Sequence, residues 1–256
     1  MGKKICISVL FLISAIGIYS FFVEPRWLEA THHQIQGRVE SPIKIAHLTD
    51  LHFGNLFRLE KDVLTEIKKE QPDIIFITGD LYEDLNQLEE MTNFFTQLRA
   101  PLGVWGVKGN WENWVPVSDE HSFWETLGVN LLTNQKMTIR EDIELFGYDD
   151  ESSGRPDRNL ASKETDKFRI CLFHSPSFFE KASANCSLSL SGHTHGGQIK
   201  IPFWGPLWLP KGSTPFLGGW YHLEESHMYV SRGLGTSVLP LRFGSRPELS
   251  FITVSR

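Results

Sequence analysis

The sequence predicts an α/β domain, with a layered sheet and helices outside it, behind an N-terminal transmembrane helix. Two features of the 256 residues predict this class. Short apolar runs alternate with stretches of helical periodicity, which is typical of layered α/β sheets. An uncharged run at residues 5–23 precedes them, and as a helix it would span roughly 30 Å, enough to cross a bilayer. The hydrophobic fraction of 41% suffices for one substantial core.

The N-terminal run favours an uncleaved membrane anchor over residues 1–23. A cleaved signal peptide would have a shorter apolar region and a cleavage site of small residues, whereas this run ends in bulky side chains. Lys3 and Lys4 precede the run, so the positive-inside rule places the N-terminus in the cytoplasm and the domain on the outer side. Residues 24–42 are interpreted as a tether, and residues 43–256 as the folded domain.

The elements of the domain can be read in order from their periodicity. Leu59, Val63 and Ile67 are four residues apart and share one helical face. Residues 74–77 are an isoleucine-rich run between a proline and a glycine, as expected of a buried strand. The same criteria predict strands at 43–48, 74–77, 104–107, 168–173 and 187–191, and a strand pair within 137–147. They predict helices at 59–69, 88–98 and 118–127. Further short strands are expected from there to the C-terminus.

Five of these strands stop at a polar cluster. The clusters are 50–52, 79–80, 109–110, 174 and 192–195. In open α/β sheets, ligands bind at the carboxyl ends of the strands. The five clusters therefore deliver their side chains to one rim.

The residues at this rim are suited to metal ions. Asp50 and His52 are two apart in an extended segment and point the same way, and His193 and His195 repeat this spacing. Each short motif alone is common in caps, turns and cores, but the ordered set is not. Seven ligands exceed what one tetrahedral zinc accepts, and a set without thiolate suits Mn, Fe or Zn. Two divalent ions that share Asp80 would use all of them: Asp50, His52, Asp80, Asn110, His174, His193 and His195.

The ordered blocks resemble the calcineurin-like metallophosphoesterase superfamily. They are Asp50-Leu51-His52, Gly79-Asp80, Gly109-Asn110-Trp111-Glu112, His174 and Gly192-His193-Thr194-His195. The resemblance implies a two-sheet β-sandwich flanked by helices. It also implies that one metal takes Asp50, His52, Asp80 and His195, and that the other takes Asp80, Asn110, His174 and His193. Water activated at the two metals would then attack phosphorus in line, with Asp80, Asn110 and His193 as catalytic residues.

A narrower resemblance extends to the anchor and the C-terminal tail. Three segments carry it: the N-terminal anchor, residues 192–198 and the tail at residues 231–244. They are similar to the bacterial membrane-associated branch that includes UDP-2,3-diacylglucosamine hydrolases. This branch implies cleavage of UDP-2,3-diacylglucosamine to UMP and 2,3-diacylglucosamine 1-phosphate, in lipid A biosynthesis at the cell inner membrane. Because such nucleotide-linked lipids are cytoplasmic, while the lysines place the domain outside, the side of the membrane stays open. The alternatives are a broad phosphodiesterase for lipid or cell-wall phosphates and a non-catalytic metal-dependent scaffold.

One residue departs from the superfamily pattern. Many members carry a histidine where this chain has Trp111, and that histidine is thought to assist the leaving group. Trp cannot act as an acid, so either the substrate has a good leaving group, such as the phosphate of a pyrophosphate, or another residue such as His121 is the acid. We expect Trp111 and Arg242 to contact substrate, and Glu112 to orient a ligand.

The composition excludes some partners. A net charge of −6 argues against sequence-independent nucleic-acid binding, which needs clustered Lys and Arg. No protein partner is inferred, and the expected partners are the membrane and a phosphorylated or nucleotide-linked lipid. Three cysteines without paired spacing predict no disulfide, with Cys171 packing as a small apolar residue. The aromatic stretch 201–221 is either a surface for acyl chains or membrane, or a loop that buries its rings.

Overall fold

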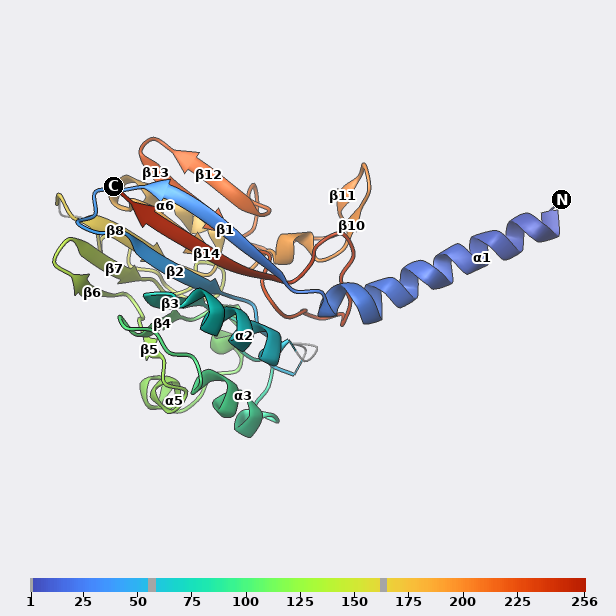
Figure 1. Cartoon of the computed structure of the whole chain (residues 1–256), viewed down its shortest axis with the longest axis horizontal. Coiled ribbons are helices and arrows are strands. Elements are labelled where there is room, and N and C mark those ends of the chain that lie inside the picture. Colours follow the sequence, from blue (N-terminus) through green and yellow to red (C-terminus); the bar gives the residue numbers. More distant parts are fainter. Residues whose placement is uncertain (1, 55–58, 162–164) are drawn as a thin grey trace.

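Two six-stranded sheets form the body of the protein, and an apolar helix projects from one end of it (Figure 1). The structure is a computed structural model, and it describes residues 2–54, 59–161 and 165–256. Helices flank the two sheets, as the resemblance implied. The predicted α/β fold with an N-terminal apolar helix is confirmed.

The first sheet carries three of the predicted strands at its centre. Its order is β1 (Glu29–Gln36), β14 (Glu248–Ser255), β2 (Ile43–Leu48), β3 (Ile74–Thr78), β4 (Val104–Val107) and β5 (Asn130–Leu131). The last four strands run parallel, while β14 is antiparallel to β2. The carboxyl ends of β2, β3 and β4 therefore meet at one edge.

The second sheet repeats this arrangement. Its order is β12 (Gly219–Leu223), β13 (Ser226–Val230), β9 (Leu188–Ser191), β8 (Phe168–Leu172), β7 (Ile143–Gly147) and β6 (Gln135–Arg140). The strands from β13 to β7 run parallel, and the outer strands β12 and β6 are antiparallel to their neighbours. A small hairpin of β10 (Lys200–Ile201) and β11 (Gly205–Pro206) stands apart.

The central strands are apolar on both faces because both faces are covered. Ile74 and Phe76 of β3 pack in the cluster between the sheets, whereas Ile75 and Ile77 face the helices. This explains why the strand reads as a continuous apolar run instead of an alternating one. The helices on the outer face of the first sheet are α2 (Glu60–Glu70), α3 (Leu88–Phe95) and α5 (Glu120–Thr126), and the short α6 (Phe179–Ala182) covers the second sheet.

The segment 24–42, which the sequence suggested was a tether, is part of the domain. Its residues 29–36 form β1, which pairs in parallel with β14 over its whole length. β1 is an edge strand with mostly polar, half-buried side chains, so it lacks the apolar run by which the other strands were recognised. Its partner lies more than two hundred residues away in the sequence, and only the folded chain shows the pairing.

The expectation of no disulfide is also wrong. Cys171 and Cys186 are bonded, with their Cα atoms 5.9 Å apart. Cys171 lies in β8 and Cys186 lies just before β9, and these two strands are hydrogen-bonded neighbours. Sheet pairing therefore brings the sulfurs together, which their spacing in the sequence does not indicate. Both side chains are buried, so Cys171 also packs as expected.

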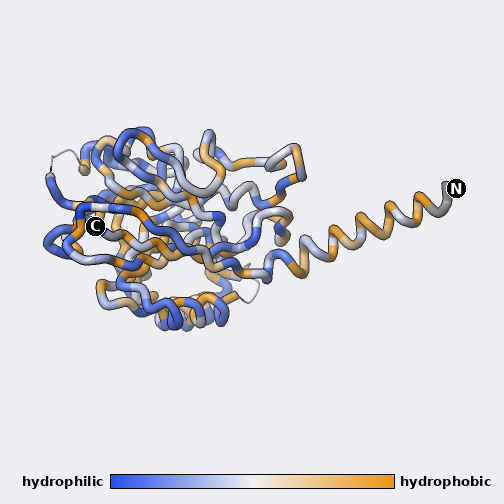
Figure 2. Tube along the Cα trace, turned by 45° about the horizontal axis from the view of Figure 1, so that its top comes forward, coloured by the Kyte–Doolittle hydropathy of each residue, from blue (hydrophilic) through white to orange (hydrophobic). Residues whose placement is uncertain are grey.

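The N-terminal helix α1 (Gly2–Ile18) continues through the irregular turns η1 (Tyr19–Val23) and η2 (Glu24–Arg26). By length and composition, Ile5–Arg26 could cross a membrane, and Figure 2 shows mostly hydrophobic residues along the helix. Its base is fixed to the domain, because the Arg242 N–H donates to the Ser20 carbonyl at 3.0 Å and the Ser245 N–H donates to Glu24 Oε1 at 2.5 Å. Glu24 is buried, so the helix joins the domain through folded structure.

Candidate metal centre

All seven predicted ligands gather at the seam between the two sheets. Three stretches follow β2, β3 and β4 of the first sheet, and two follow β8 and β9 of the second. Each side chain is buried. The parallel strands of both sheets point their carboxyl ends at this seam, which is why residues far apart in the sequence meet there.

The first group contains Asp50, His52 and His195, whose ligand atoms all lie within 4.8 Å of one another. The Nε2 atoms of His52 and His195 are 3.2 Å apart. Asp50 Oδ1 lies 3.4 Å from Nε2 of His195. This spacing of one oxygen and two nitrogens is suited to a single cation.

The second group contains Asp80, His174 and His193, again within 4.8 Å. Asp80 Oδ2 and His193 Nδ1 lie 3.1 Å and 3.0 Å from Nε2 of His174. Asn110 adds its amide oxygen, Oδ1, 3.2 Å from the same nitrogen. The division of ligands thus matches the one that the resemblance implied.

Asp80 lies between the two groups. Its Oδ2 atom is 3.1 Å from His174 Nε2 and 3.6 Å from His52 Nε2. One carboxylate oxygen therefore reaches ligands of both groups. This is the placement expected of a residue that bridges two ions.

The donor set fits two divalent cations. Asp50 and Asp80 are buried carboxylates, and within residues 2–54, 59–161 and 165–256 their ion pairs are with histidines alone. Buried charge without a counter-charge is costly, and bound cations would balance it. Carboxylate, amide and imidazole ligands suit Mn, Fe or Zn.

Five of the ligand residues have an unusual backbone conformation. Asp50, His52, Asp80, His193 and His195 all have positive φ, between 42° and 73°. Such angles cost on the order of 1–3 kcal/mol each when the residue is not glycine, and they cluster at functional sites. Backbone hydrogen bonds hold them, including Asp50 N–H to the Gly79 carbonyl and His52 N–H to the Asp80 carbonyl, both at 3.0 Å. These conformations direct the five side chains into the two ligand groups.

Two glycines allow the loops to approach one another. A Cβ on Gly109 would collide with the carboxylate of Asp80, and one on Gly192 would collide with Asp50 and Thr49. The glycine before Asn110 and the glycine before His193 are thus needed for close packing of the ligand loops.

A second layer of groups orients the ligands. The Glu112 carboxylate accepts from the N–H groups of Asp80, Leu81 and Gly109 at 3.0, 2.6 and 2.7 Å, which agrees with its expected orienting role. Glu83 Oε1 lies 3.2 Å from Nδ1 of His52. Glu112 thus fixes the backbone at Asp80, and the Glu83 carboxylate is an ionic partner for the ring of His52. Sequence reasoning missed Glu83, because a lone acidic residue three positions after Asp80 carries no motif.

Two of the other three imidazoles, those of His174 and His193, are held by main-chain carbonyls. His174 Nδ1 lies 2.6 Å from the Thr78 carbonyl, and His193 Nε2 lies 2.8 Å from the Lys211 carbonyl. Each contact occupies the nitrogen that faces away from its group. This leaves His174 Nε2 and His193 Nδ1 directed at the shared centre.

The surroundings shift the pKa values of two ligand histidines, His174 and His195, in opposite directions. Burial opposes a charge on His174, but the carboxylate of Asp80 outweighs it and raises the pKa of His174 well above its usual value. Burial and then the neighbouring His52 hold the pKa of His195 well below its usual value. Burial and Asp80 raise the pKa of Glu112 to about 7. The carboxylates therefore stabilise positive charge at the seam, which is the charge that cations would bring.

Trp111 lies at the edge of the centre. The ring of Trp111 meets that of His52 edge to face at 5.9 Å, and the main-chain N–H of Trp111 donates to Asp80 Oδ1 at 3.0 Å. The side chain is half-buried. This position is compatible with the predicted substrate contact, which stays a prediction. His121, the alternative acid, is exposed on α5.

The predicted substrate contact through Arg242 is wrong. Its side chain is fully buried, and the guanidinium donates to the carbonyls of Gly235, Ser245, Arg232 and Gly233 at 2.5–3.1 Å. These main-chain acceptors take up its hydrogen-bonding capacity, so no donor is directed at a phosphate. Arg242 instead ties the segments after β13 together beneath the metal centre.

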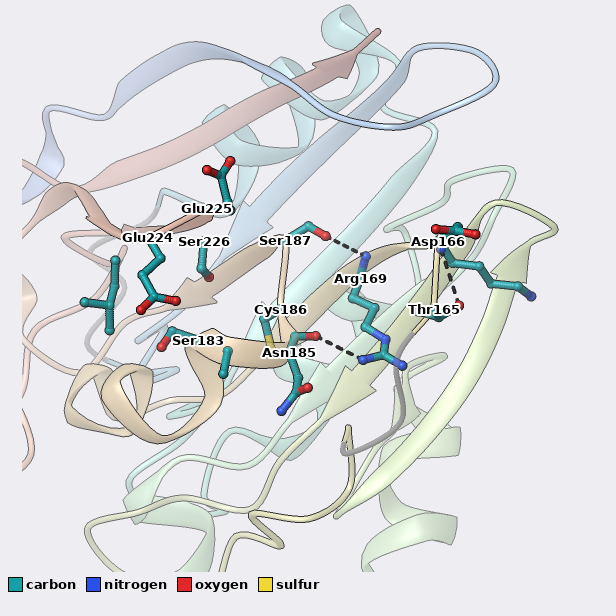
Figure 3. Close-up of a pocket in the computed structure, with 13 residues that line it drawn as sticks. Thr165, Asp166, Arg169, Ser183, Asn185, Cys186, Ser187, Glu224, Glu225 and Ser226 are labelled. Atoms are coloured by element: carbon teal, nitrogen blue, oxygen red, sulfur yellow. Dashed lines mark hydrogen bonds between the residues drawn. The ribbon is translucent and has the colours of Figure 1, made fainter.

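A separate surface pocket lies at the opposite end of the second sheet. Figure 3 shows Arg169, Ser187 and Glu224 among the residues that line this cavity of about 550 Å³. Arg169 begins β8 and Ser187 precedes β9, whereas the metal ligands follow the carboxyl ends of the same strands. The Arg169 guanidinium donates to Glu144 at 3.2 Å and to the Ala161 carbonyl at 3.1 Å. The pocket therefore takes no part in the metal centre.

Comparison with known proteins decides the family. Residues 43–197 match the family model described as calcineurin-like phosphoesterase. The chain belongs to this family. As a calcineurin-like phosphoesterase it is a metal-dependent phosphoester hydrolase with two metal-binding groups, so the scaffold alternative is set aside.

Its relatives are bacterial and animal phosphoesterases of similar length or longer. It is 32% identical over 92% of its length to the uncharacterized metallophosphoesterase YkuE of Bacillus subtilis, covering 88% of that protein. It is 29% identical to the phosphodiesterase YaeI of Escherichia coli, with 91% of each chain covered. A Bos taurus transmembrane protein with a metallophosphoesterase domain is 29% identical over 98% of this chain and 62% of its own.

Proposed function

We propose that this phosphoesterase hydrolyses a phosphodiester or pyrophosphate bond in a lipid-linked substrate at a membrane surface. The observation that supports it most is the pair of buried ligand groups that meet at Asp80, next to the base of an apolar helix. The specific candidate is UDP-2,3-diacylglucosamine, cleaved to UMP and 2,3-diacylglucosamine 1-phosphate at the inner membrane.

The chain's own residues account for binding and orientation in this reaction. Two divalent ions, when bound, supply an activated water and neutralise charge on the phosphoryl oxygens. We assign one to Asp50, His52, Asp80 and His195, and the other to Asp80, Asn110, His174 and His193. Glu112 holds the backbone that carries Asp80 through its hydrogen bonds, and Glu83 lies beside the ring of His52.

Trp111 favours substrates with a good leaving group. It occupies the position beside Asn110 where an acid would protonate the departing oxygen, and indole cannot donate a proton in this way. An alkoxide leaving group needs such an acid. A departing phosphate has a second pKa of about 6 and leaves without one. A pyrophosphate bond fits this site better than a simple alkyl monoester.

The disulfide favours a second candidate, a phosphodiesterase for lipid or cell-wall phosphates at the outer face. Disulfides such as Cys171–Cys186 persist in oxidising compartments and are rare in the cytosol. Lys3 and Lys4 also place the domain outside by the positive-inside rule. UDP-linked lipids lie on the cytoplasmic side, so the side of the membrane separates the two candidates.

The test is hydrolysis by the detergent-solubilised full chain with Mn²⁺. UMP release from UDP-2,3-diacylglucosamine that disappears in His193→Ala supports the specific candidate. Turnover of bis-p-nitrophenyl phosphate without UMP release retains the enzyme class and rejects that substrate. Loss of neither activity in His193→Ala would contradict the proposed ligand set.

Sidedness requires a separate measurement. Reporters that are active only outside or only inside the cytoplasm are fused to the C-terminus of the full chain. Activity of the cytoplasmic reporter would favour the UDP-linked substrate. Activity of the external reporter would favour the outer-face phosphodiesterase.

A further inference from the structure

An apolar groove opens beside the metal centre. It has a volume of about 290 Å³, and the metal ligand His195 forms part of its lining. Leu207 and Trp208, which follow β11, and Val238 and Leu239, which follow β13, provide its apolar surface. The groove therefore shares His195 with the metal centre and adjoins it.

Large apolar side chains at the rim of this groove are exposed to solvent. Trp208 is 67% exposed and Val238 is 77% exposed. The nearby hairpin adds Phe203, which is fully exposed, and Trp204 at 83%. Contiguous apolar surface of this kind marks a binding site or a membrane contact in a soluble domain.

The groove is a built feature of the fold. Val238 has a φ of 65°, which is an outlier for a β-branched residue. Gln198 holds the segment on both sides of it, because its Nε2 donates to the carbonyls of Ser237 and Leu239 at 3.1 and 3.0 Å and its Oε1 accepts from the Ser237 N–H at 3.0 Å. The hydrogen bonds of Gln198 thus hold Val238 in a strained conformation that exposes its apolar side chain. Strain of this kind indicates that the exposed side chain has a functional role.

The groove also lies on the side from which the apolar helix projects. Figure 1 shows the β10–β11 hairpin beside the base of α1. The Lys200 N–H donates to the Phe243 carbonyl at 2.7 Å, and the Phe243 ring meets that of Tyr19 at 6.3 Å. A bilayer crossed by α1 would therefore face the exposed rim.

We propose that this groove holds one hydrocarbon chain of a membrane lipid whose phosphate lies at the metal centre. The inference rests on the proposed function and names the part of the substrate that the site recognises. The position of the groove on the side from which the apolar helix projects favours a lipid chain as occupant over a second copy of this protein. Each methylene buried from water raises affinity roughly fourfold, so even a short buried segment gives a large preference for long-chain esters.

The test compares two chromogenic phosphodiesters, methyl and dodecyl p-nitrophenyl phosphate. The full chain is placed in phosphatidylcholine nanodiscs, so that partition of the long chain into lipid is the same for every variant. Val238→Asn replaces the apolar side chain by a polar one, and asparagine tolerates the positive φ of this position. Leu223→Asn is the matched control, an exposed leucine at the far end of β12.

In the wild type the KM for the dodecyl ester should be below that for the methyl ester, and the part of this preference that the groove supplies is the part that Val238→Asn removes. Val238→Asn should raise the dodecyl KM about fourfold or more while leaving methyl turnover and the Leu223→Asn profile unchanged. Equal KM values for both esters in the wild type, or equal losses on both esters in Val238→Asn, would overturn the groove. A dimer that Val238→Asn dissociates would instead assign the groove to a second copy. Failure to hydrolyse either ester would count against the proposed function itself.

Discussion

Removing the disulfide between Cys171 and Cys186 should destabilise the domain measurably. The bond closes a loop with a sequence separation of 15 residues. In the chain-entropy description, a loop of this length constrains the unfolded chain by about 3 kcal/mol. We therefore expect the double variant Cys171→Ala/Cys186→Ala to lose about that much free energy of unfolding, and its urea midpoint to fall by about 1 M.

The assay is urea unfolding of the detergent-solubilised full chain, with and without a thiol reductant. Because both sulfurs are buried, reductant acts on the unfolded chain, and it should lower the wild-type midpoint while leaving that of the double variant unchanged. Cys6→Ala removes the exposed free cysteine and serves as the control without effect.

Thiol counting decides whether the bond forms in the cell. Chain that is purified without reductant, then denatured and alkylated, should carry a single label, on Cys6. Labelling of all three cysteines would refute the disulfide and with it the argument for an oxidising compartment. The outer-face phosphodiesterase would then lose the support that the disulfide gives it over the UDP-linked candidate.

Three further outcomes test the metal centre and the fold around it. Asp80→Asn should reduce bound metal below two ions per chain by elemental analysis and abolish diester hydrolysis, and two retained ions would refute the bridging role. Glu83→Gln should weaken metal affinity by about 10–100-fold in a chelator competition, since it loosens the ring of His52; unchanged affinity would show that the contact is incidental. Burial lowers the pKa of His47 to about 3, so on acidification His47 is protonated in the unfolded chain before it is protonated in the folded one. The free energy of unfolding therefore falls as the pH drops from 6.5 towards 3, by about 2 kcal/mol between pH 7 and pH 5. His47→Asn should lose that slope in urea titrations at the two pH values, and an unchanged slope would refute a buried neutral imidazole.

The strands that carry the ligands were predictable because their signals are local. Residues 74–77 form a strand buried on both faces, and such a strand needs a continuous apolar run whatever its neighbours are. The polar residues that follow, such as Asp80 and His174, then fall at carboxyl strand ends by geometry alone. Their grouping into two sets was available from the family resemblance, and the distances agree with it.

The features that escaped prediction depend on partners distant in the sequence. β1 is polar and joins the sheet only because β14 presents an open edge to it. Arg242 looked like a phosphate ligand by chemistry, but five carbonyls in its surroundings take up its donors. The positive φ values of Asp50 and His195 are likewise set by the surrounding loops. Local pattern carries no information on any of these.

The join between helix and domain bears directly on what the enzyme can reach. The Ser245 N–H donates to Glu24 Oε1 at 2.5 Å, and the Ser245 hydroxyl donates to the carbonyl of His195 at 2.7 Å. Ser245 thus links the base of the helix to a metal ligand through two buried hydrogen bonds. A flexible tether would let the site sample soluble phosphoesters at many heights above a bilayer, whereas this join would hold the site at one depth if α1 crosses a bilayer. A site held in this way is suited to a phosphate whose own position is fixed by a lipid chain, which is the geometry that the groove beside His195 offers.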